Sequence, residues 1–248
     1  MRAKLLSMAG HEIRRPLELT PQAISEAAKD PTLVALRFAL AKFASEEFHQ
    51  VGRLLHVGGH IIGPDRAAGA SPFGHGSDEV VAISMLLRIA SQLVSASADL
   101  FSDGRPYAAA ALLRQVVEIE YLAWAFETRD RDAERWLRSD EQQRQNFFRP
   151  AKLRAAAQGR FRSKDYGYHC ELGGHPVPNA AILLAGDTAT SQLLLSDLLG
   201  HVGRIWDHLM GWAKLHGEDF ILERNSEMLL RFREWKSKDT LVDLPPPP

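Results

Sequence analysis

Hydrophobic residues recur along most of the chain at the spacing of one face of an α-helix. In residues 33–55 they stand three or four positions apart, and the same period returns in 80–94, 107–126 and 188–212. No alternating apolar and polar pattern longer than four residues, of the kind that a strand would need, interrupts these segments. The pattern therefore predicts an all-α protein, folded as an antiparallel helical bundle.

Capping and turn residues divide this pattern into separate helices. Thr20-Pro21 and Asp30-Pro31 each place a capping side chain before a proline at the first helical position, so we expect a helix to begin at each pair. Gly58-Gly59 is expected to end the second of these helices. Ser77 should cap the next helix, and the turn at 103–106 should join that helix to an antiparallel neighbour.

The second half of the chain is predicted to hold shorter elements before long helices return. In order, we expect a charged helix at 129–145, a basic helix from 150 to about 158, a turn at 166–176, a short helix near 180–184, a long helix from 188 or 190 to 212 and a last helix at 219–235. The domain organisation that follows is a flexible arm at 1–20, a single helical domain at 21–240 with a Gly-rich loop at 58–78, and a disordered Pro-rich tail at 241–248.

Composition and charge narrow the classes of protein that fit. The 248 residues are 45% hydrophobic with a formal net charge of −1, so the chain can bury a core and has no overall positive charge to attract nucleic acid or membranes. Cys170 is the only cysteine, which excludes an internal disulfide and fits a reducing compartment. The sequence begins without the apolar run of a signal peptide, and charges interrupt its apolar segments before the roughly 20 residues of a membrane span. We therefore expect a cytoplasmic protein with no membrane partner and no cofactor.

Residues 166–176 are the strongest candidate for a functional site. They hold two tyrosines, two histidines, a cysteine and a glutamate within eleven positions. His169 and His175 suit general acid–base or phosphate-contacting roles, because imidazole titrates near neutral pH. The alternative is a packed turn in which these side chains hydrogen-bond to backbone groups.

Two pairs of polar residues stand on helices that are otherwise apolar. Arg114 and Glu118 lie one turn apart and form either a weak surface ion pair or part of a site. Asp197 and His201 also lie one turn apart, in a stripe that continues through Arg204 and His208. That stripe is either the exposed face of an amphipathic helix or the source of a pair that shares a metal ion or orients an imidazole.

A metal site is an alternative that the spacing does not favour. His169, Glu171 and His175 are ligand types, and Asp197 or His201 could join them. Their spacing matches no standard zinc pattern, and one cysteine cannot build a structural zinc site. We therefore predict no metal, with Glu171, Asp197 and His201 as the alternative ligands.

A run of positive charge precedes the histidine-rich segment. Residues 144–164 contain no acidic side chain and include Phe147, Phe148 and Phe161. Basic side chains interleaved with aromatic ones are typical of proteins that bind single-stranded nucleic acid, although a charge run is also an ordinary solvated face. The candidate nucleic-acid contacts are Arg149, Lys152, Arg154, Arg160 and Lys164, and Arg144 and Arg162 complete the run.

Arg162 and His169 enclose six residues within this helical chain. An arginine followed by four to six residues and a histidine is found in ribonucleases of the HEPN group of small helical bacterial proteins, which the chain resembles over about residues 79–215. Residues 113–118 and 168–176 also look like segments of related helical bacterial families. The resemblance implies a homodimer that acts on RNA as a metal-independent endoribonuclease, a toxin or a defence protein, with an antitoxin or another protein as a candidate partner.

In that hypothesis Arg162 would hold the scissile phosphate and His169 would act as the acid or base, while Arg114 and Glu118 would support the site. A second hypothesis is a non-catalytic helical module that binds a ligand or partner between the loop at 58–76 and the histidine-rich segment. A third is the metalloenzyme described above. Convergence of these distant polar residues in space would favour a site over scattered surface polarity.

Overall fold

The structure is a computed structural model, and over the residues that it describes the fold is an all-α helical bundle, as the pattern predicts. The described residues are 21–62, 77–161, 163–185 and 187–242. The expected arm at 1–20, residues 63–76 of the Gly-rich loop and residues 243–248 of the tail lie outside them.

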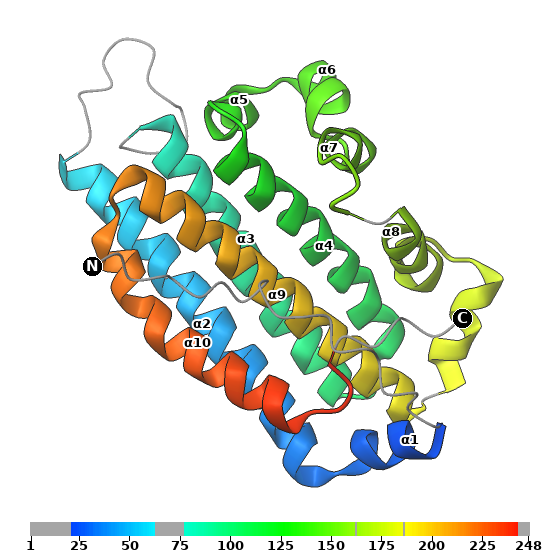
Figure 1. Cartoon of the computed structure of the whole chain (residues 1–248). Helices are drawn as coiled ribbons and strands as arrows, with labels where there is room; N and C mark the ends of the chain where they lie inside the picture. The colour runs from blue at the N-terminus through cyan, green and yellow to red at the C-terminus, as the bar shows by residue number, and fades with distance from the viewer. Residues whose placement is uncertain (1–20, 63–76, 162, 186, 243–248) are drawn as a thin grey trace.

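Five long helices form the bundle, and α9 packs against each of the other four (Figure 1). α2 packs against α3, α3 against α4, α4 against α9, α9 against α10, and α10 against α2. Neighbours along the chain run antiparallel, whereas α4 and α9 run in the same direction (Figure 1). The five helices are α2 (Pro31–Ile62), α3 (Asp78–Ser102), α4 (Pro106–Thr128), α9 (Thr188–His216) and α10 (Asp219–Lys238).

Shorter helices cover the outer side of α4 and one end of the bundle (Figure 1). The segment between α4 and α9 carries most of them, and it is this segment that brings His169 back against α4 and α9. They are α1 (Pro21–Lys29), α5 (Asp132–Arg138), α6 (Glu141–Gln143), the π-helix η1 (Arg144–Phe148), α7 (Pro150–Ala156), α8 (Ser163–His169), the π-helix η2 (Cys170–Gly174) and the 3₁₀-helix η3 (Pro178–Ala185).

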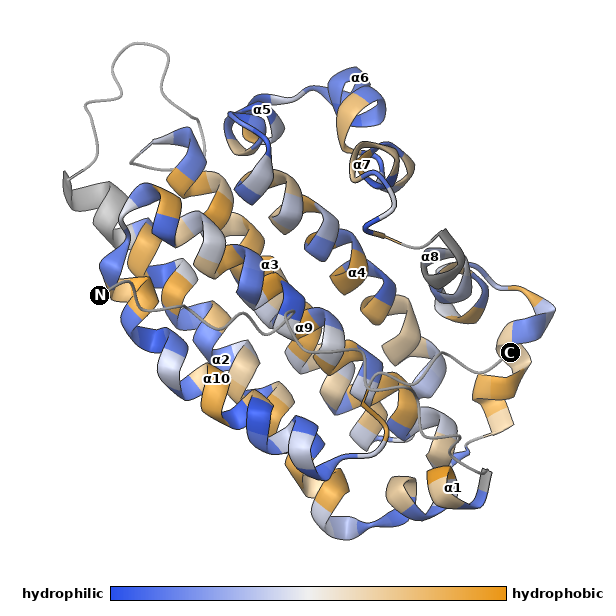
Figure 2. Cartoon of the chain, in the orientation of Figure 1, coloured by the Kyte–Doolittle hydropathy of each residue, from blue (hydrophilic) through white to orange (hydrophobic). Residues whose placement is uncertain are grey.

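Large aromatic side chains fill the centre of the bundle. Each long helix carries both hydrophobic and hydrophilic residues (Figure 2), and the hydrophobic ones supply most of the buried side chains. Burial of one such large apolar side chain stabilises the fold by about 1.5–3 kcal/mol, so these residues hold the five helices together. The largest fully buried aromatic residues are Phe48, Trp206, Trp212, Phe232 and Trp235.

A fully buried ion pair ties the two ends of the described chain together. Arg37 on α2 donates to both carboxylate oxygens of Asp239, with Nε–Oδ2 at 2.6 Å and Nη2–Oδ1 at 2.7 Å. Gln192 accepts from Arg37 Nη1 at 2.9 Å, and the indole of Trp235 donates to Asp239 at 2.7 Å. Because most donors and acceptors are satisfied, the pair is tolerated in the core and fixes the turn that follows α10.

Three expectations about helix boundaries are wrong. Gly58-Gly59 does not end α2, which continues to Ile62, because a glycine inside a helix costs only about 1 kcal/mol. The helix expected at 129–145 is divided, because Asp140 forms a capping box with Gln143 and starts a new helix. The turn expected at 166–176 is largely helical, as the end of α8 followed by η2.

α3 is the one helix in the described part of the chain that is long and apolar enough, by length and composition, to cross a membrane. Its apolar composition has another physical cause in this fold. Val81, Leu86, Leu87 and Val94 are buried in the centre of the bundle, where α3 packs against α2 and α4. A helix in that position needs hydrophobic residues on most of its surface.

Candidate metal centre

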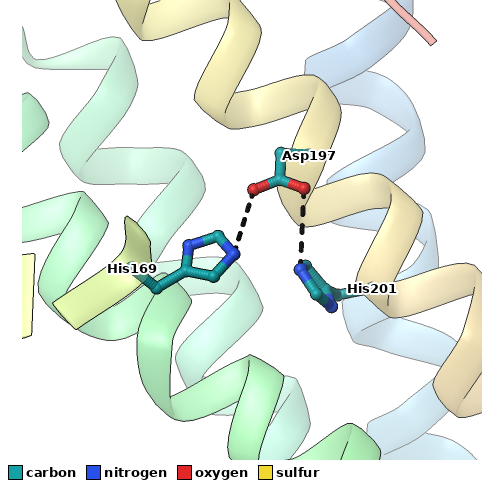
Figure 3. A group of neighbouring side chains, drawn as sticks. All are labelled: His169, Asp197 and His201. Carbon is teal, nitrogen blue, oxygen red and sulfur yellow. Dashed lines mark ion pairs between the residues drawn. The ribbon is translucent and has the colours of Figure 1, made fainter. Parts of the chain in front are cut away.

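Two histidines and an aspartate meet where the end of α8 approaches α9. His169 is the last residue of α8, and Asp197 and His201 lie one turn apart on α9. One carboxylate oxygen of Asp197 faces each imidazole (Figure 3). The distances are 3.4 Å from His169 Nε2 to Oδ2 and 3.5 Å from His201 Nε2 to Oδ1. One donor atom from each of the three residues can be chosen so that all lie within 4.8 Å of one another.

The two contacts to Asp197, each to a different carboxylate oxygen, are closer to the spacing of neighbouring metal ligands than to that of hydrogen bonds. Hydrogen bonds between nitrogen and oxygen span about 2.7–3.2 Å, so contacts of 3.4 and 3.5 Å are long for that purpose. With metal–ligand bonds of about 2.1 Å, neighbouring ligand atoms of a tetrahedral site lie about 3.4 Å apart. Two imidazoles and a carboxylate are also the donor set of many zinc and non-haem iron sites.

Glu120 on α4 fixes the orientation of the His201 ring. Its Oε2 lies 2.5 Å from His201 Nδ1, and its Oε1 accepts from Arg204 Nε at 2.8 Å. Arg204 Nη2 also lies 2.8 Å from His201 Nδ1, but an ionised Glu120 beside that nitrogen favours a proton on it. With Nδ1 as the donor to Glu120, Nε2 is left as the ligand atom toward Asp197, as in carboxylate–histidine–metal arrangements.

The protonation states of His169 and of the neighbouring Glu120 suit a cation site. Burial lowers the pKa of His169 to about 4, against the opposing pull of Asp197, so its imidazole is neutral at pH 7 and has a lone pair for a metal ion. Burial raises the pKa of Glu120, but Arg204 and His201 outweigh burial and lower it to about 2. Glu120 is therefore a permanent negative charge beside the cluster.

Two polar atoms at this place are buried without a hydrogen-bond partner among the described residues. They are Oδ2 of Asp197 and the hydroxyl oxygen of Tyr168, whose ring packs edge-on against His169 at 5.4 Å between centroids. An unsatisfied buried polar group costs about 1–3 kcal/mol, and such groups are rare without a functional reason. A cation with its bound water would give both oxygens a partner.

Exposure differs among the side chains of the cluster. The side chains of His169 and His201 are only 4% and 7% exposed, whereas Asp197 is 36% and Arg204 39% exposed. Three protein ligands leave a fourth position for water or substrate, which is typical of catalytic rather than structural zinc sites. The guanidinium of Arg204 lies behind His201, on the Nδ1 side of its ring, where it pairs with Glu120.

Arg114 and Glu118 form the predicted pair, but on another face of α4. Arg114 Nη2 lies 3.0 Å from Glu118 Oε1 and donates to the hydroxyl of Tyr166 at 3.2 Å. Tyr166 in turn donates to Glu118 at 2.8 Å, and the guanidinium of Arg154 lies 4.3 Å from the centre of its ring. These contacts attach α7 and α8 to α4, so this group positions the segment that carries His169.

The remaining candidates of the histidine-rich segment do not join the cluster. The side chains of His175 and Glu171 are exposed, and Glu171 accepts a long contact of 3.4 Å from Asn179. Arg162 lies outside the described residues, as does the side chain of Lys164. The described part of the segment therefore contributes His169 and Tyr168 to the cluster.

The basic run lies on α7 and its flanks. Arg149, Lys152 and Arg160 are exposed, and Arg154 is half-buried over Tyr166. Phe161 does not present its ring for base stacking, because it packs against Tyr121 and Trp124, with centroids 4.3 and 5.6 Å away. Of the three phenylalanines of the run, only Phe147 is largely exposed.

The α9 stripe faces α4 rather than solvent at both histidines. His201 meets Glu120, and His208 meets Glu127, with 2.5 Å from His208 Nδ1 to Glu127 Oε2. The second pair lies seven residues after the first on both helices, as expected where two parallel helices are in contact. Only the cluster around the first pair has the second histidine and the aspartate.

Sequence reasoning missed Glu120. It stands two positions after Glu118, on another face of α4, and it was passed over because the pairing of Arg114 with Glu118 was the local signal. A single carboxylate in the otherwise apolar stretch 119–126 is the signal that could find it, because a buried carboxylate needs a partner.

Comparison of the chain with protein-family models, with curated proteins and with solved structures gives no match. The functional argument therefore rests on the geometry of the cluster and the chemistry of its side chains.

Proposed function

We propose that this protein is a metal-dependent enzyme that holds one divalent transition-metal ion through His169, Asp197 and His201. The observation that supports it most is the convergence of one donor atom from each residue within 4.8 Å of one another, with Glu120 hydrogen-bonded behind His201. Two nitrogen donors and one oxygen donor favour Zn²⁺ or Fe²⁺ over Mg²⁺ and Ca²⁺, which prefer oxygen alone.

The chemistry that suits such a site is hydrolysis of an anionic substrate. A metal ion with three protein ligands can bind a water molecule and lower its pKa toward neutrality. Arg204, which pairs with Glu120 behind His201 and is 39% exposed, adds positive charge near the site that would favour an anionic substrate. The neutral His169 and the ionised Glu120 keep the site competent to bind a cation near pH 7.

Zinc titration of chelator-treated protein tests the site. Isothermal titration calorimetry should give one Zn²⁺ per chain, and Asp197→Ala and His169→Ala should each weaken binding at least a hundredfold, because each removes one of three ligands. His175→Ala is the matched control, since this exposed histidine lies outside the cluster and its loss should leave the affinity unchanged.

Hydrolysis tests the enzymatic part of the proposal. Zinc-loaded protein should hydrolyse an activated phosphodiester such as bis-p-nitrophenyl phosphate, and Asp197→Ala should abolish that activity while His175→Ala retains it. Absence of stoichiometric metal binding would overturn the whole proposal. Binding without hydrolysis of this or other activated esters would leave a metal-binding protein and overturn the enzyme.

RNA binding is a second candidate function, and one observation favours it. Arg149, Lys152 and Arg160 are exposed on α7 and its flanks, within a stretch of 21 residues, 144–164, that has no acidic side chain. Phosphate contacts dominate nucleic-acid affinity, so a local positive surface suits RNA even in a protein of net charge −1. In this function the HEPN-like resemblance would assign phosphate binding to Arg162 and proton transfer to His169.

Gel retardation of single-stranded RNA tests this candidate. The double variant Arg149→Ala/Lys152→Ala should weaken binding and reduce its dependence on salt, because a protein with fewer phosphate contacts releases fewer counterions when it binds. Arg231→Ala, on α10 and paired with Glu227, is the control for loss of one surface charge. Cleavage that persists in excess chelator and is lost in Arg162→Ala would favour the metal-independent ribonuclease over the metalloenzyme.

A further inference from the structure

A concave site lies away from the metal cluster, between the first turn of α3, α5 and the π-helix η1. It is a cleft of about 460 Å³, within the range of about 300–1,000 Å³ that is usual for small-molecule sites. None of the residues of the metal cluster lines it. The lining side chains that matter here are Asp78, Arg131, Glu134, Arg135, Arg138 and Phe147.

The backbone around the cleft departs from regular helix at two places. Arg131, which precedes α5, has a φ of 61°, a left-handed conformation that costs a residue other than glycine roughly 1 kcal/mol or more. Residues 144–148 form a π-helix, a conformation that is rare and occurs frequently at functional sites. Both irregularities direct side chains of the cleft, Arg131 and Phe147, and ordinary helices would place them elsewhere.

Phe147 presents an aromatic ring to the cleft. Its side chain remains 43% exposed, while the neighbouring Phe148 is buried in the core. The guanidinium of Arg135 lies 4.7 Å from the centre of the Phe147 ring, so a ligand ring that stacks on this face would displace or sandwich that guanidinium. An exposed phenyl ring in a cleft is a platform for a planar ring of a ligand.

The arginines of the cleft are held by carboxylates that a ligand can replace or join. Arg131 Nε lies 3.1 Å from Glu134, and Arg138 pairs with Asp78. The side chains of Arg131 and Arg138 are 73% and 49% exposed, so water can reach both guanidinium groups, although Asp78 is only 12% exposed. Exposed ion pairs such as that of Arg131 with Glu134 contribute at most about 1 kcal/mol. A phosphate can bind a guanidinium with two hydrogen bonds at once, so it competes well with such partners.

We propose that this cleft binds a nucleoside monophosphate, with the base stacked on Phe147 and the phosphate held by Arg131 and Arg138. The lining has three arginines and two carboxylates, and because Arg135 also pairs with Asp132 behind the cleft, Arg131 and Arg138 are the arginines assigned to the phosphate. The inference does not depend on the metal centre, since no residue is shared between the two sites.

Calorimetric titration of the metal-free, full-length protein with AMP, adenosine and inorganic phosphate tests the proposal. AMP should bind at least ten times more tightly than either fragment, because only AMP offers both a base and a phosphate. Phe147→Ala should weaken AMP about tenfold or more, as expected for loss of one stacking platform, and leave the weak phosphate binding unchanged. Arg131→Gly, which keeps the left-handed backbone, should weaken AMP and spare adenosine.

Leu230→Ala is the control, since this exposed residue lies on α10 and not in the cleft. Circular dichroism of each variant confirms that it is folded. The proposal is overturned if AMP does not bind at millimolar concentration, if phosphate alone binds as well as AMP, or if AMP binds Phe147→Ala and the wild type equally. Equal affinity of AMP for Asp197→Ala is expected, and loss there would place the nucleotide at the metal cluster instead.

Discussion

At the scale of single residues, burial decides what His169 can do. Its side chain is 4% exposed and its pKa is lowered to about 4, first by burial and against the opposing effect of Asp197. A neutral imidazole has a lone pair for a metal ion. A side chain that is so deeply buried is poorly placed to reach a large substrate such as RNA from solvent. This favours the metal centre over an acid–base role for His169 on RNA.

His169 also predicts how the metal-free protein responds to acid. The unfolded chain binds a proton on this residue near pH 6.5, whereas the folded chain resists it until about pH 4. The free energy of unfolding should therefore fall by about 3 kcal/mol between those pH values on account of this one residue. Urea denaturation in excess chelator at pH 7, 6, 5 and 4 measures it.

The same titration on two variants separates His169 from other groups. In His169→Gln the loss of stability between pH 6.5 and 4 should be smaller by that amount, whereas His175→Gln, exposed in the folded chain, should follow the wild type. An identical pH dependence for wild type and His169→Gln would show that His169 is not buried in neutral form.

The buried pair of Arg37 and Asp239 gives a second prediction at this scale. Asp239→Ala leaves the Arg37 guanidinium buried without its main partner, which should lower the free energy of unfolding by about 3–5 kcal/mol. Glu227→Ala breaks an exposed pair with Arg231 and should cost less than about 1 kcal/mol. Comparable losses for the two variants in urea denaturation would contradict the burial of the first pair.

At the scale of elements, the contact between α4 and α9 organises the candidate site. The two helices run parallel and carry two Glu–His pairs in the same register, Glu120 with His201 and Glu127 with His208. Only the first pair lies beside His169 and Asp197. The pair of Glu127 and His208 is therefore an internal control for the role of Glu120 behind the proposed ligand His201.

Substitution of the two glutamates should separate their roles. Glu120→Gln should weaken zinc binding about 10- to 100-fold, because loss of a carboxylate behind a histidine ligand has effects of that size. Glu127→Gln should leave the zinc affinity within about twofold of the wild type, since His208 is not a proposed ligand. Equal effects of both substitutions on zinc affinity, measured by calorimetry, would indicate a general change in the contact between α4 and α9 instead.

The close approach of η2 to α4 also fixes the position of His169. A Cβ atom on Gly173 would lie 2.4 Å from the backbone nitrogen of Ala111, so the two backbones would have to separate. Gly173→Ala should therefore lower stability by about 1–3 kcal/mol and weaken zinc binding.

Gly167 is the matched comparison, because a Cβ atom there meets nothing within 4 Å. Gly167→Ala should retain the zinc affinity and raise the free energy of unfolding by up to about 1 kcal/mol, as alanine favours the helix. Thermal denaturation with and without zinc measures both variants. A Gly173→Ala protein as stable as the wild type would show that this contact is looser than described.

At the scale of the whole molecule, the sequence was sufficient for the bundle and insufficient for the site. The capping pair Asp30-Pro31 and the cap at Ser77 are local signals, and the helices begin where they stand. The i, i+4 spacing of Asp197 and His201 likewise marked two members of the cluster.

The other members depend on tertiary packing, which local patterns do not contain. Whether Glu118 or Glu120 faces α9 is decided by how α4 rotates in the bundle, and the pairing of Glu118 with Arg114 gave no sign of it. His169 comes to α9 only because α8 and η2 pack back on α4. Glycines and prolines in 166–176 suggested an irregular turn, but contacts with α4 hold most of it as helix.

We propose above all that one cation binds between His169, Asp197 and His201. Crystals of the protein grown with Zn²⁺ and measured at the zinc absorption edge test it most directly. We expect one anomalous-difference peak per chain within the cluster, about 2.0–2.2 Å from the Nε2 atoms of His169 and His201 and from a carboxylate oxygen of Asp197. Zinc peaks elsewhere on the molecule with none in this cluster would contradict it.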